Sequence, residues 1–176
     1  ATTSILVGML LPAVSAAREA GRRATSINNL RQVMLAMVAH EAATMRLPAR
    51  AIFDKNGKPL LSWRVQLLPY LDQMELYEQF HLDEPWDSEH NKKLIGRMPS
   101  VFRNPTSMAP PGTTTYLAVC GKGLMFDGQE GRRMAEIFDG LSNTIAVVEA
   151  NDDRAVVWTK PDDWSPGEES PLDGLG

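Results

Sequence analysis

The stretch that decides the fold is ILVGMLLPAVSAAREAGRRATSINNLRQVMLAMV, residues 5–38. Its first part, Ile5 to Val14, carries no charge, whereas arginines recur from Arg18 onward. Apolar residues then follow at spacings of three, four and seven, which is typical of one face of a helix: Leu30, Val33, Met34, Met37 and Val38. We therefore predict one long helix that ends near Met45, because the dipeptide 47–48, Leu-Pro, favours extended backbone.

At about 1.5 Å per residue this helix is roughly 60 Å long, more than a small domain can cover. An overhanging helix of this kind indicates a partner, either a membrane or other copies of the chain. The uncharged run 5–14 is about half of the ~20 residues that span a bilayer. A signal peptide is disfavoured, since no basic residue precedes the run and the helical pattern continues beyond it. We expect the lower part of a longer hydrophobic stem, kinked but not ended at Pro12.

Composition limits the remaining possibilities. A chain of 176 residues suits one compact domain plus the helix, which we divide into a helix at 1–46 (apolar stem 5–14, amphipathic part 15–46) and a head at 47–176. The net charge of −4 argues against a nucleic-acid partner. The arginines of the helix are either a solvated face or a contact for lipid headgroups or a neighbour's acidic loops. A single cysteine excludes an intrachain disulfide and any cysteine-based zinc site.

Short helices are predicted in the first part of the head. The turn 54–57, Asp-Lys-Asn-Gly, precedes a helix over 63–68 that Ser62 caps. Asp72 and Glu75 have the spacing of a capping box and should open a helix to about residue 80. Ser88 is the expected cap of a third helix that runs to about residue 98, and residues 132–138 form one or two helical turns.

Strands are predicted only in the second half, at 113–120, 142–149 and 155–159, with a short edge strand at 101–103. The sequence 151–153, Asn-Asp-Asp, is a plausible hairpin turn between the second and third strands. The tail from residue 160 is rich in proline and should be irregular. The expected fold class is α+β, with a long N-terminal helix packed on a small antiparallel sheet with long loops.

Several motifs recur in a characteristic order. They are LLPAVSAAREAGRR (10–23), NNLRQ (28–32), LSWRV (61–65), LPYL (68–71), HLDEPWDS (81–88), HN (90–91), DGLSNTI (139–145) and VWTKP (157–161). Together they resemble the planctomycete type IV pilin-like family, whose members usually begin with a prepilin cleavage and methylation signal. The resemblance covers nearly the whole chain. It implies a pilin or pseudopilin architecture, export from the cytoplasm, embedding in the membrane and assembly into a filament.

The sequence departs from the family pattern in three ways. The prepilin signal is absent, so we expect either a piece of a longer chain or a copy that is exported and processed differently. The family's C-terminal H-x9-DG element is also absent. Many relatives carry cysteines where Ser26 and Asn104 stand here. The resemblance therefore implies that these two positions are adjacent, as after the loss of a disulfide pair.

Three groups of polar residues are candidate metal sites. Carboxylates and imidazoles gather in His81, Asp83, Glu84, Asp87, Glu89 and His90, a set that suits zinc or calcium. Pro85 and Trp86 divide this set, so we favour a loop pinned by Trp86. The turn 54–57 resembles the start of a calcium loop but lacks its other ligands, and a plain turn is favoured. The pairs 152–153 and 162–163, all Asp, form a calcium site only if the tail folds back over the hairpin.

No catalytic constellation is evident. Ser142 lacks the Gly-x-Ser-x-Gly elbow, and His40 lies on the long helix, so we interpret them as a turn serine and a helix-surface histidine. Cys120 is expected to be a small buried apolar side chain. The four tryptophans are either core anchors for long loops, which we favour, or a carbohydrate platform: Trp63, Trp86, Trp158 and Trp164.

From these observations we expect a non-enzymatic structural subunit of a type IV pilus-like or pseudopilus-like filament, without a cofactor or bound metal, at the cell envelope or cell surface. Its partners are other copies of itself and, before assembly, membrane lipid. The alternative is a secreted or membrane-anchored module that binds a glycan or solute. The residues expected to mediate self-assembly are Leu6, Met9, Leu10, Leu11, Pro12, Val14, Arg18 and Arg22.

Overall fold

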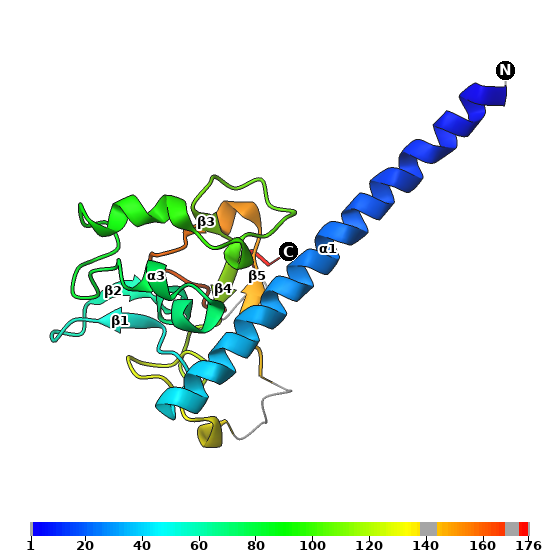
Figure 1. Ribbon diagram of the computed structural model, residues 1–176. Helices are drawn as coiled ribbons and strands as arrows, with labels where there is room; N and C mark the ends of the chain where they lie inside the picture. Colours follow the sequence, from blue (N-terminus) through cyan, green and yellow to red (C-terminus); the bar gives the residue numbers. More distant parts are fainter. Residues whose placement is uncertain (1, 138–143, 168–172, 176) are drawn as a thin grey trace.

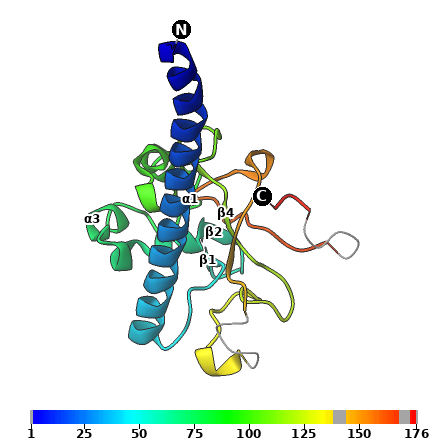
Figure 2. The ribbon, with the colours of Figure 1, turned by 90° about the vertical axis from the view of Figure 1, so that its right-hand side faces the viewer.

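The computed structural model describes the backbone at 2–137, 144–167 and 173–175, and within these ranges the side chains from residue 14 onward. One long helix, α1 (Thr2–Thr44), lies along one side of the head and projects far beyond it (Figures 1 and 2). The helix ends at Thr44, next to the predicted end near Met45, and Met45 itself has a left-handed conformation with φ 61°. The helix continues through Pro12 as predicted, but the expected kink is not visible in Figure 1. Small backbone adjustments spread over several turns can absorb the steric clash of one proline.

The first half of the head contains a hairpin, which corrects the prediction of strands only in the second half. Strands β1 (Ala51–Phe53) and β2 (Pro59–Ser62) pair antiparallel. The predicted turn joins them: Asp54 Oδ1 accepts hydrogen bonds from the backbone N–H groups of Asn56 and Lys58, both at 2.8 Å. Gly57 takes the positive φ that this turn requires, 80°. The turn was evident in the sequence, whereas its two short flanking strands were missed.

The second half of the head forms two small antiparallel pairs. Strand β4 (Tyr116–Ala118) pairs with β5 (Val147–Glu149), and β3 (Thr113–Thr114) pairs with β6 (Val156–Val157). The predicted hairpin at 151–153 is wrong, because β5 and β6 pair with different strands and the 3₁₀ helix η6 (Asp152–Arg154) lies between them. The single strand predicted at 113–120 is divided in two, and residues 142–143 of the strand predicted at 142–149 lie outside the described residues.

Short helices fill the rest of the head. Ser62 caps α2 (Trp63–Gln66), since its hydroxyl accepts a bond from Arg64 N, as predicted. Asp72 is not the predicted N-cap: it is the C-cap of the 3₁₀ helix η1 (Leu68–Leu71), with φ 56°, and Gln73 stands at the N-cap of α3 (Met74–Tyr77). Ser88 accepts a bond from Asn91 N, but the helix there, η2 (Asn91–Arg97), is 3₁₀.

Two further 3₁₀ helices complete the head, η3 (Ser100–Phe102) and η4 (Met134–Glu136). The first replaces the edge strand predicted at 101–103, and the second falls within the helical turns predicted at 132–138.

One apolar core joins the helix to the head. Val33 and Met37 of α1 are fully buried in it together with Trp63, Phe102 and Trp158. The closest packing of α1 is against η1 and η3. The molecule is thus α+β: a long N-terminal helix lies on a loop-rich head with small antiparallel sheets.

Candidate assembly surface

The part of α1 that leaves the head is exposed on every side. We call residues 14–25 the shaft; every residue in it is exposed, including Val14, whose surface is 48% accessible. Figure 1 shows α1 leaving the head and projecting away from it. Arg18 and Arg22 belong to the shaft, whereas the side chains of Leu6, Met9, Leu10, Leu11 and Pro12 lie outside the described residues.

From residue 26 onward α1 has two apolar faces, not one. The inner face packs on the head and is buried at Val33, Ala36 and Met37. The outer face consists of Ile27, Met34, Leu35 and Val38, which are between 36% and 63% accessible. Met34 and Val38 were predicted to share a face with Val33, which is wrong, and Ile27 and Leu35 were not predicted to belong to an apolar face. The sequence does contain a pattern that indicates the outer face: apolar residues recur at i, i+7, i+8 and i+11 from residue 27, a spacing that places them on one side of a helix.

A polar cluster fixes the base of the shaft to the head. The Ser26 hydroxyl donates to Glu149 Oε2 at 2.7 Å, and Asn104 Nδ2 donates to Glu149 Oε1 at 2.7 Å. Ser26 also lies 2.7 Å from the Tyr116 hydroxyl, and burial raises the pKa of that phenol, an effect that its bond to Ser26 opposes. Ser26 and Asn104, which the resemblance implied to be close, thus bind the same carboxylate.

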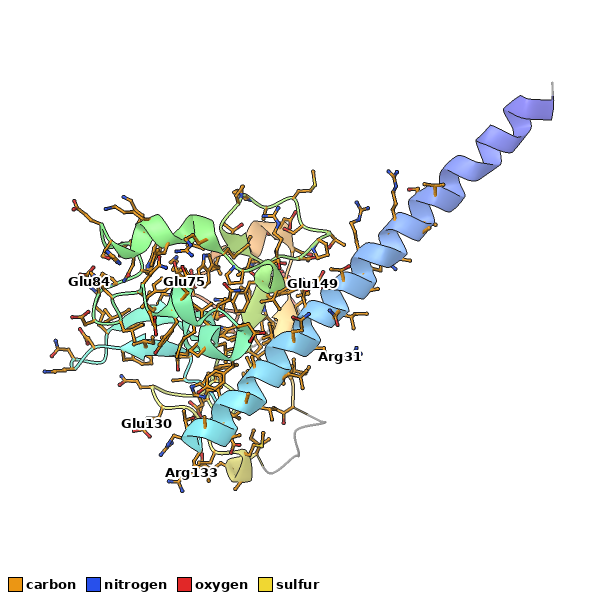
Figure 3. All side chains as sticks on the ribbon, viewed as in Figure 1. Arg31, Glu75, Glu84, Glu130, Arg133 and Glu149 are labelled. Carbon is orange, nitrogen blue, oxygen red and sulfur yellow. The ribbon has the colours of Figure 1, made fainter. Side chains whose placement is uncertain are left out.

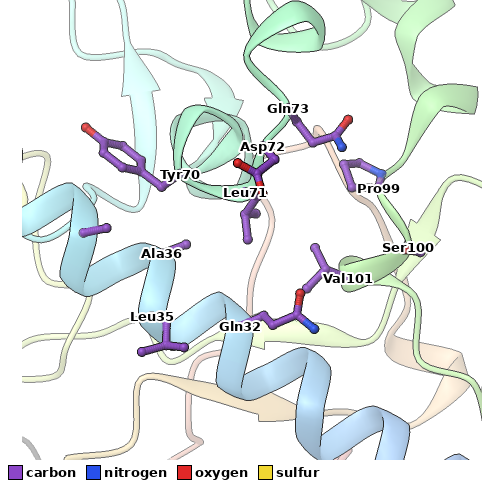
Figure 4. Close-up of a pocket in the computed structure, with 11 residues that line it drawn as sticks. Gln32, Leu35, Ala36, Tyr70, Leu71, Asp72, Gln73, Pro99, Ser100 and Val101 are labelled. Atoms are coloured by element: carbon purple, nitrogen blue, oxygen red, sulfur yellow. The ribbon is translucent and has the colours of Figure 1, made fainter.

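A groove runs between α1 and the head. It has a volume of about 410 Å³ and lies between Gln32, Leu35, Ala36 and Ala39 of the helix and the loops around Leu71 and Val101. Figure 4 shows Ala36, Leu71 and Val101 toward its interior and the polar groups of Asp72 and Gln73 on the side opposite the helix. The exposed Leu35 of the outer face forms part of its helix wall, so the outer face and the groove are continuous.

Charge is divided between helix and head. Arg23 pairs with Glu19 at 2.5 Å within the shaft, whereas Arg18, Arg22 and Arg31 have no ion pair or hydrogen bond among the described residues. Figure 3 shows Arg31 on α1, Glu75 over the middle of the head and Glu84 at the edge of the head farthest from the projecting shaft. Asp72 at the groove likewise makes no ion pair within the described part of the chain.

The side chains considered as metal ligands make other contacts within the fold. His81 Nδ1 pairs with Glu84 Oε1 at 2.9 Å, which lowers the pKa of the Glu84 carboxyl, and the rings of His81 and His90 stack at 3.6 Å. Within the described ranges, no three His, Cys, Asp or Glu side chains converge to hold a metal ion. Asp152 bonds to Ser107 and to Met108 N, and both contacts lower the pKa of its carboxyl; Asp163 is occupied elsewhere.

The remaining candidate groups serve the fold. Trp63 and Trp158 are fully buried and Trp164 is 9% accessible, so three of the four tryptophans anchor the core as favoured. His40 Nδ1 lies 2.9 Å from Arg46 O at the end of the helix. Ser142 lies outside the described residues. Cys120 is buried as expected, and burial raises the pKa of its thiol to about 12.

A buried ion pair, which the sequence did not reveal, links the motif LSWRV to the C-terminal tail. Arg64 of LSWRV is fully buried, and its Nη2 donates to Asp163 Oδ1 at 2.8 Å and to Tyr116 O at 2.7 Å. Burial raises the pKa of Asp163 and lowers that of Arg64, and the attraction between them opposes both shifts. Trp63 Nε1 also donates to Asp163, at 3.0 Å. The tail after VWTKP is thereby tied to α2 and β4.

A second buried group pins the loop that carries HLDEPWDS. The Asn91 side chain, which is fully buried, accepts a bond from His81 N and donates to the carbonyl oxygens of His81, Glu84 and Pro85. Asn91 therefore holds the backbone of this loop in place.

The fold and its surface define a class of protein, an α+β head that carries a projecting N-terminal helix. The sequence matches the family described as "Protein of unknown function (DUF1559)" over residues 15–123 and 109–174. These ranges cover most of the chain, and the chain belongs to this family. No curated protein and no solved structure matches it. Among the described residues, no helix combines the length and the apolar character needed to cross a membrane.

Proposed function

We propose that the chain is a structural subunit of a type IV pilus-like or pseudopilus-like filament outside the cytoplasm, at the cell envelope or cell surface. The observation that carries the proposal is the shaft, a helix segment that is exposed on every side and continues directly into an exposed apolar face. A monomer gains nothing from ordering such a segment in water, because isolated helices draw most of their stability from packing. Neighbouring copies are the packing partner that we propose.

The ordered sequence motifs support the same role, since they resemble those of planctomycete type IV pilin-like proteins. In this proposal Leu6, Met9, Leu10, Leu11, Pro12 and Val14 contact neighbouring helices in the filament and membrane lipid before assembly. Ile27, Leu35 and Val38 continue that contact surface toward the head.

The structure does not favour the alternative, a glycan- or solute-binding module. It requires exposed aromatic side chains around a concave site, but three of the four tryptophans are buried. We also propose that the subunit is not an enzyme, in line with the engagement of His40 by the backbone and with the structural use of Arg64, Asp163 and Asn91.

The test is electron microscopy of the purified chain together with sedimentation over a range of concentrations. Filaments or concentration-dependent oligomers are expected. The variant Ile27→Asp/Leu35→Asp should lose assembly while its thermal unfolding is unchanged, because both side chains are exposed. Met108→Asp is the matched control, since Met108 is 90% accessible but lies on the head. A strictly monomeric protein at high concentration contradicts the proposal.

A further inference from the structure

The charges of the chain are segregated along its length. Residues 65–91 contain no lysine or arginine and seven carboxylates: Asp72, Glu75, Glu78, Asp83, Glu84, Asp87 and Glu89. The shaft has the opposite character, with three arginines and one glutamate. These surfaces do not meet within one molecule, because the shaft projects away from the head (Figure 1).

The acidic segment begins at the groove. Asp72 lines the groove opposite α1, and Glu75 follows within the next helical turn, with 88% of its side chain exposed. The nearest cation to Glu75 is Arg97 at 4.0 Å, at the limit of an ion pair and exposed to solvent. Contacts of that kind contribute little to stability, so the acidic side of the groove remains available to another partner.

The shaft carries arginines whose charge and spacing are complementary to these carboxylates. Arg18 and Arg22 are four residues apart and therefore lie on the same side of the helix, one turn from each other. Val14, Ala17 and Gly21 lie beside them and provide a small apolar surface, and Gly21 has open space around it. A helix with this pattern can place its small residues against Leu35 while its arginines reach the carboxylates opposite.

We propose that the groove receives the shaft of a second copy of this chain, with Arg18 and Arg22 of one copy against Asp72 and Glu75 of the other. This inference rests on the proposed filament and names the contact that specifies its register. It assigns the arginines to a neighbour's acidic loop, not to lipid headgroups. Asp72 lines the groove and Glu75 follows three residues later; both are exposed, so their carboxylates are open to the guanidinium groups of an approaching helix.

The contact predicts a stagger between neighbours. If two helices run parallel with residue 20 of one beside residue 35 of the other, the copies are offset by about 22 Å along the helix axis. Shaft and groove are different surfaces, so the contact is heterologous and repeats from copy to copy. A contact of this type produces an open filament instead of a closed dimer.

The experiment is pairwise crosslinking between full-length chains. Arg22→Cys in one chain and Asp72→Cys in a second chain carrying a different tag are mixed and treated with a short bis-maleimide. A heterodimeric product is expected. Native Cys120 should contribute little background because it is buried. The control replaces Asp72→Cys by Glu89→Cys, which removes an exposed carboxylate of the same segment that does not line the groove. Equal products from both pairs, or none from the first pair, overturn the inference.

Charge reversal provides the second measurement. Arg18→Glu/Arg22→Glu chains and Asp72→Lys/Glu75→Lys chains should each lose the contact, and a mixture of the two should regain it. If filaments form but the crosslink does not, the inferred contact between shaft and groove is wrong, whereas the proposed filament function stands. A crosslink between small oligomers without filaments supports the contact and contradicts the filament. If the Arg18→Glu/Arg22→Glu chain loses only its binding to phosphatidylserine-containing vesicles, the arginines serve lipid and the inference is wrong.

Discussion

At the scale of single residues, the head depends on charged groups that have been removed from water. A guanidinium and a carboxylate that are both buried cost several kcal/mol each to desolvate, and the cost is recovered only by mutual attraction and complete hydrogen bonding. Arg64 and Asp163 meet this condition, since Trp63 Nε1 and Ala118 N add two further donors to the carboxylate. Their pairing connects residues far apart in the sequence.

Asp163→Ala should therefore destabilise the protein by about 3–5 kcal/mol, the usual cost of stranding one member of a buried ion pair. The change leaves Arg64 charged, buried and without its counter-ion. Urea unfolding followed by tryptophan fluorescence measures the effect. Asp162→Ala is the control: its pair with Lys160 is exposed, and a change within about 0.5 kcal/mol is expected. Similar losses in both variants would show that the buried pair has no special role.

Cys120 provides a second prediction at this scale. Its thiol is buried and its pKa is raised to about 12, so at pH 8 the folded protein contains almost no thiolate at this site. We expect a thiol reagent to label the native protein only as fast as it unfolds. The unfolded thiol, with its ordinary pKa near 9, loses its proton first. The stability that the neutral thiol contributes is thus lost as pH rises through the folded pKa. Rapid labelling of the native protein would contradict the buried position.

At the scale of elements, the parts that local sequence determines were predicted and those that depend on distant partners were not. The end of α1 follows from the Leu-Pro dipeptide, and the Ser62 cap and the turn at Asp54 depend on hydrogen bonds within a few residues. The partner of β5 is β4 instead of β6, and nothing within the loop between β5 and β6 determines that choice. Tyr116, Leu117 and Ala118 are buried on both sides of the strand, so no alternating pattern indicates their register.

The same distinction applies to the surface of α1. The shaft and its arginines were predicted, because an apolar run followed by charges is visible in the sequence. The sequence did not distinguish the outer face from the inner face, because an apolar side chain can pack against the head or against another molecule, and its residue type does not indicate which. Only the position of η1 and η3 against the helix determines that Val33 is buried and Leu35 is exposed. Arg64 and Asp163 were missed since charged residues are usually exposed.

The C-terminal end of α1 is held by a close backbone contact. Arg46 Nη1 donates to Gly131 O, and Leu47 N donates to Arg132 O at 2.8 Å. A Cβ on Gly131 would stand 1.7 Å from Leu47 O, which is far closer than any real contact. Gly131→Ala should therefore destabilise the protein by about 1–3 kcal/mol, the usual range for overpacking, measured by thermal or urea unfolding. In Gly96→Ala, the control, the new methyl meets nothing within 4 Å, so stability should be unchanged. An unaffected Gly131→Ala protein would refute the close contact.

At the scale of the whole molecule, assembly through the shaft combines an apolar contact and an ionic one, and salt acts on them in opposite directions. Sodium chloride shortens the screening length from about 10 Å at 0.1 M to about 3 Å at 1 M, which weakens contacts between Arg18, Arg22 and a neighbour's Asp72. Ammonium sulfate also screens charge but strengthens apolar association by its exclusion from protein surface. The outer face at Ile27 and Leu35 should respond mainly to this second effect.

We therefore expect filament yield to fall as sodium chloride rises toward 1 M and to recover when ammonium sulfate supplies the same ionic strength. The variant Arg18→Gln/Arg22→Gln should assemble less at low salt and should lose most of its dependence on sodium chloride, because the groups being screened are gone. Light scattering and sedimentation at matched protein concentration measure both responses, with Arg133→Gln as a control, since Arg133 is exposed at the opposite end of the molecule (Figure 3). If the double variant keeps the full sodium chloride response, the ionic contribution arises elsewhere on the surface and the shaft associates through apolar contacts alone.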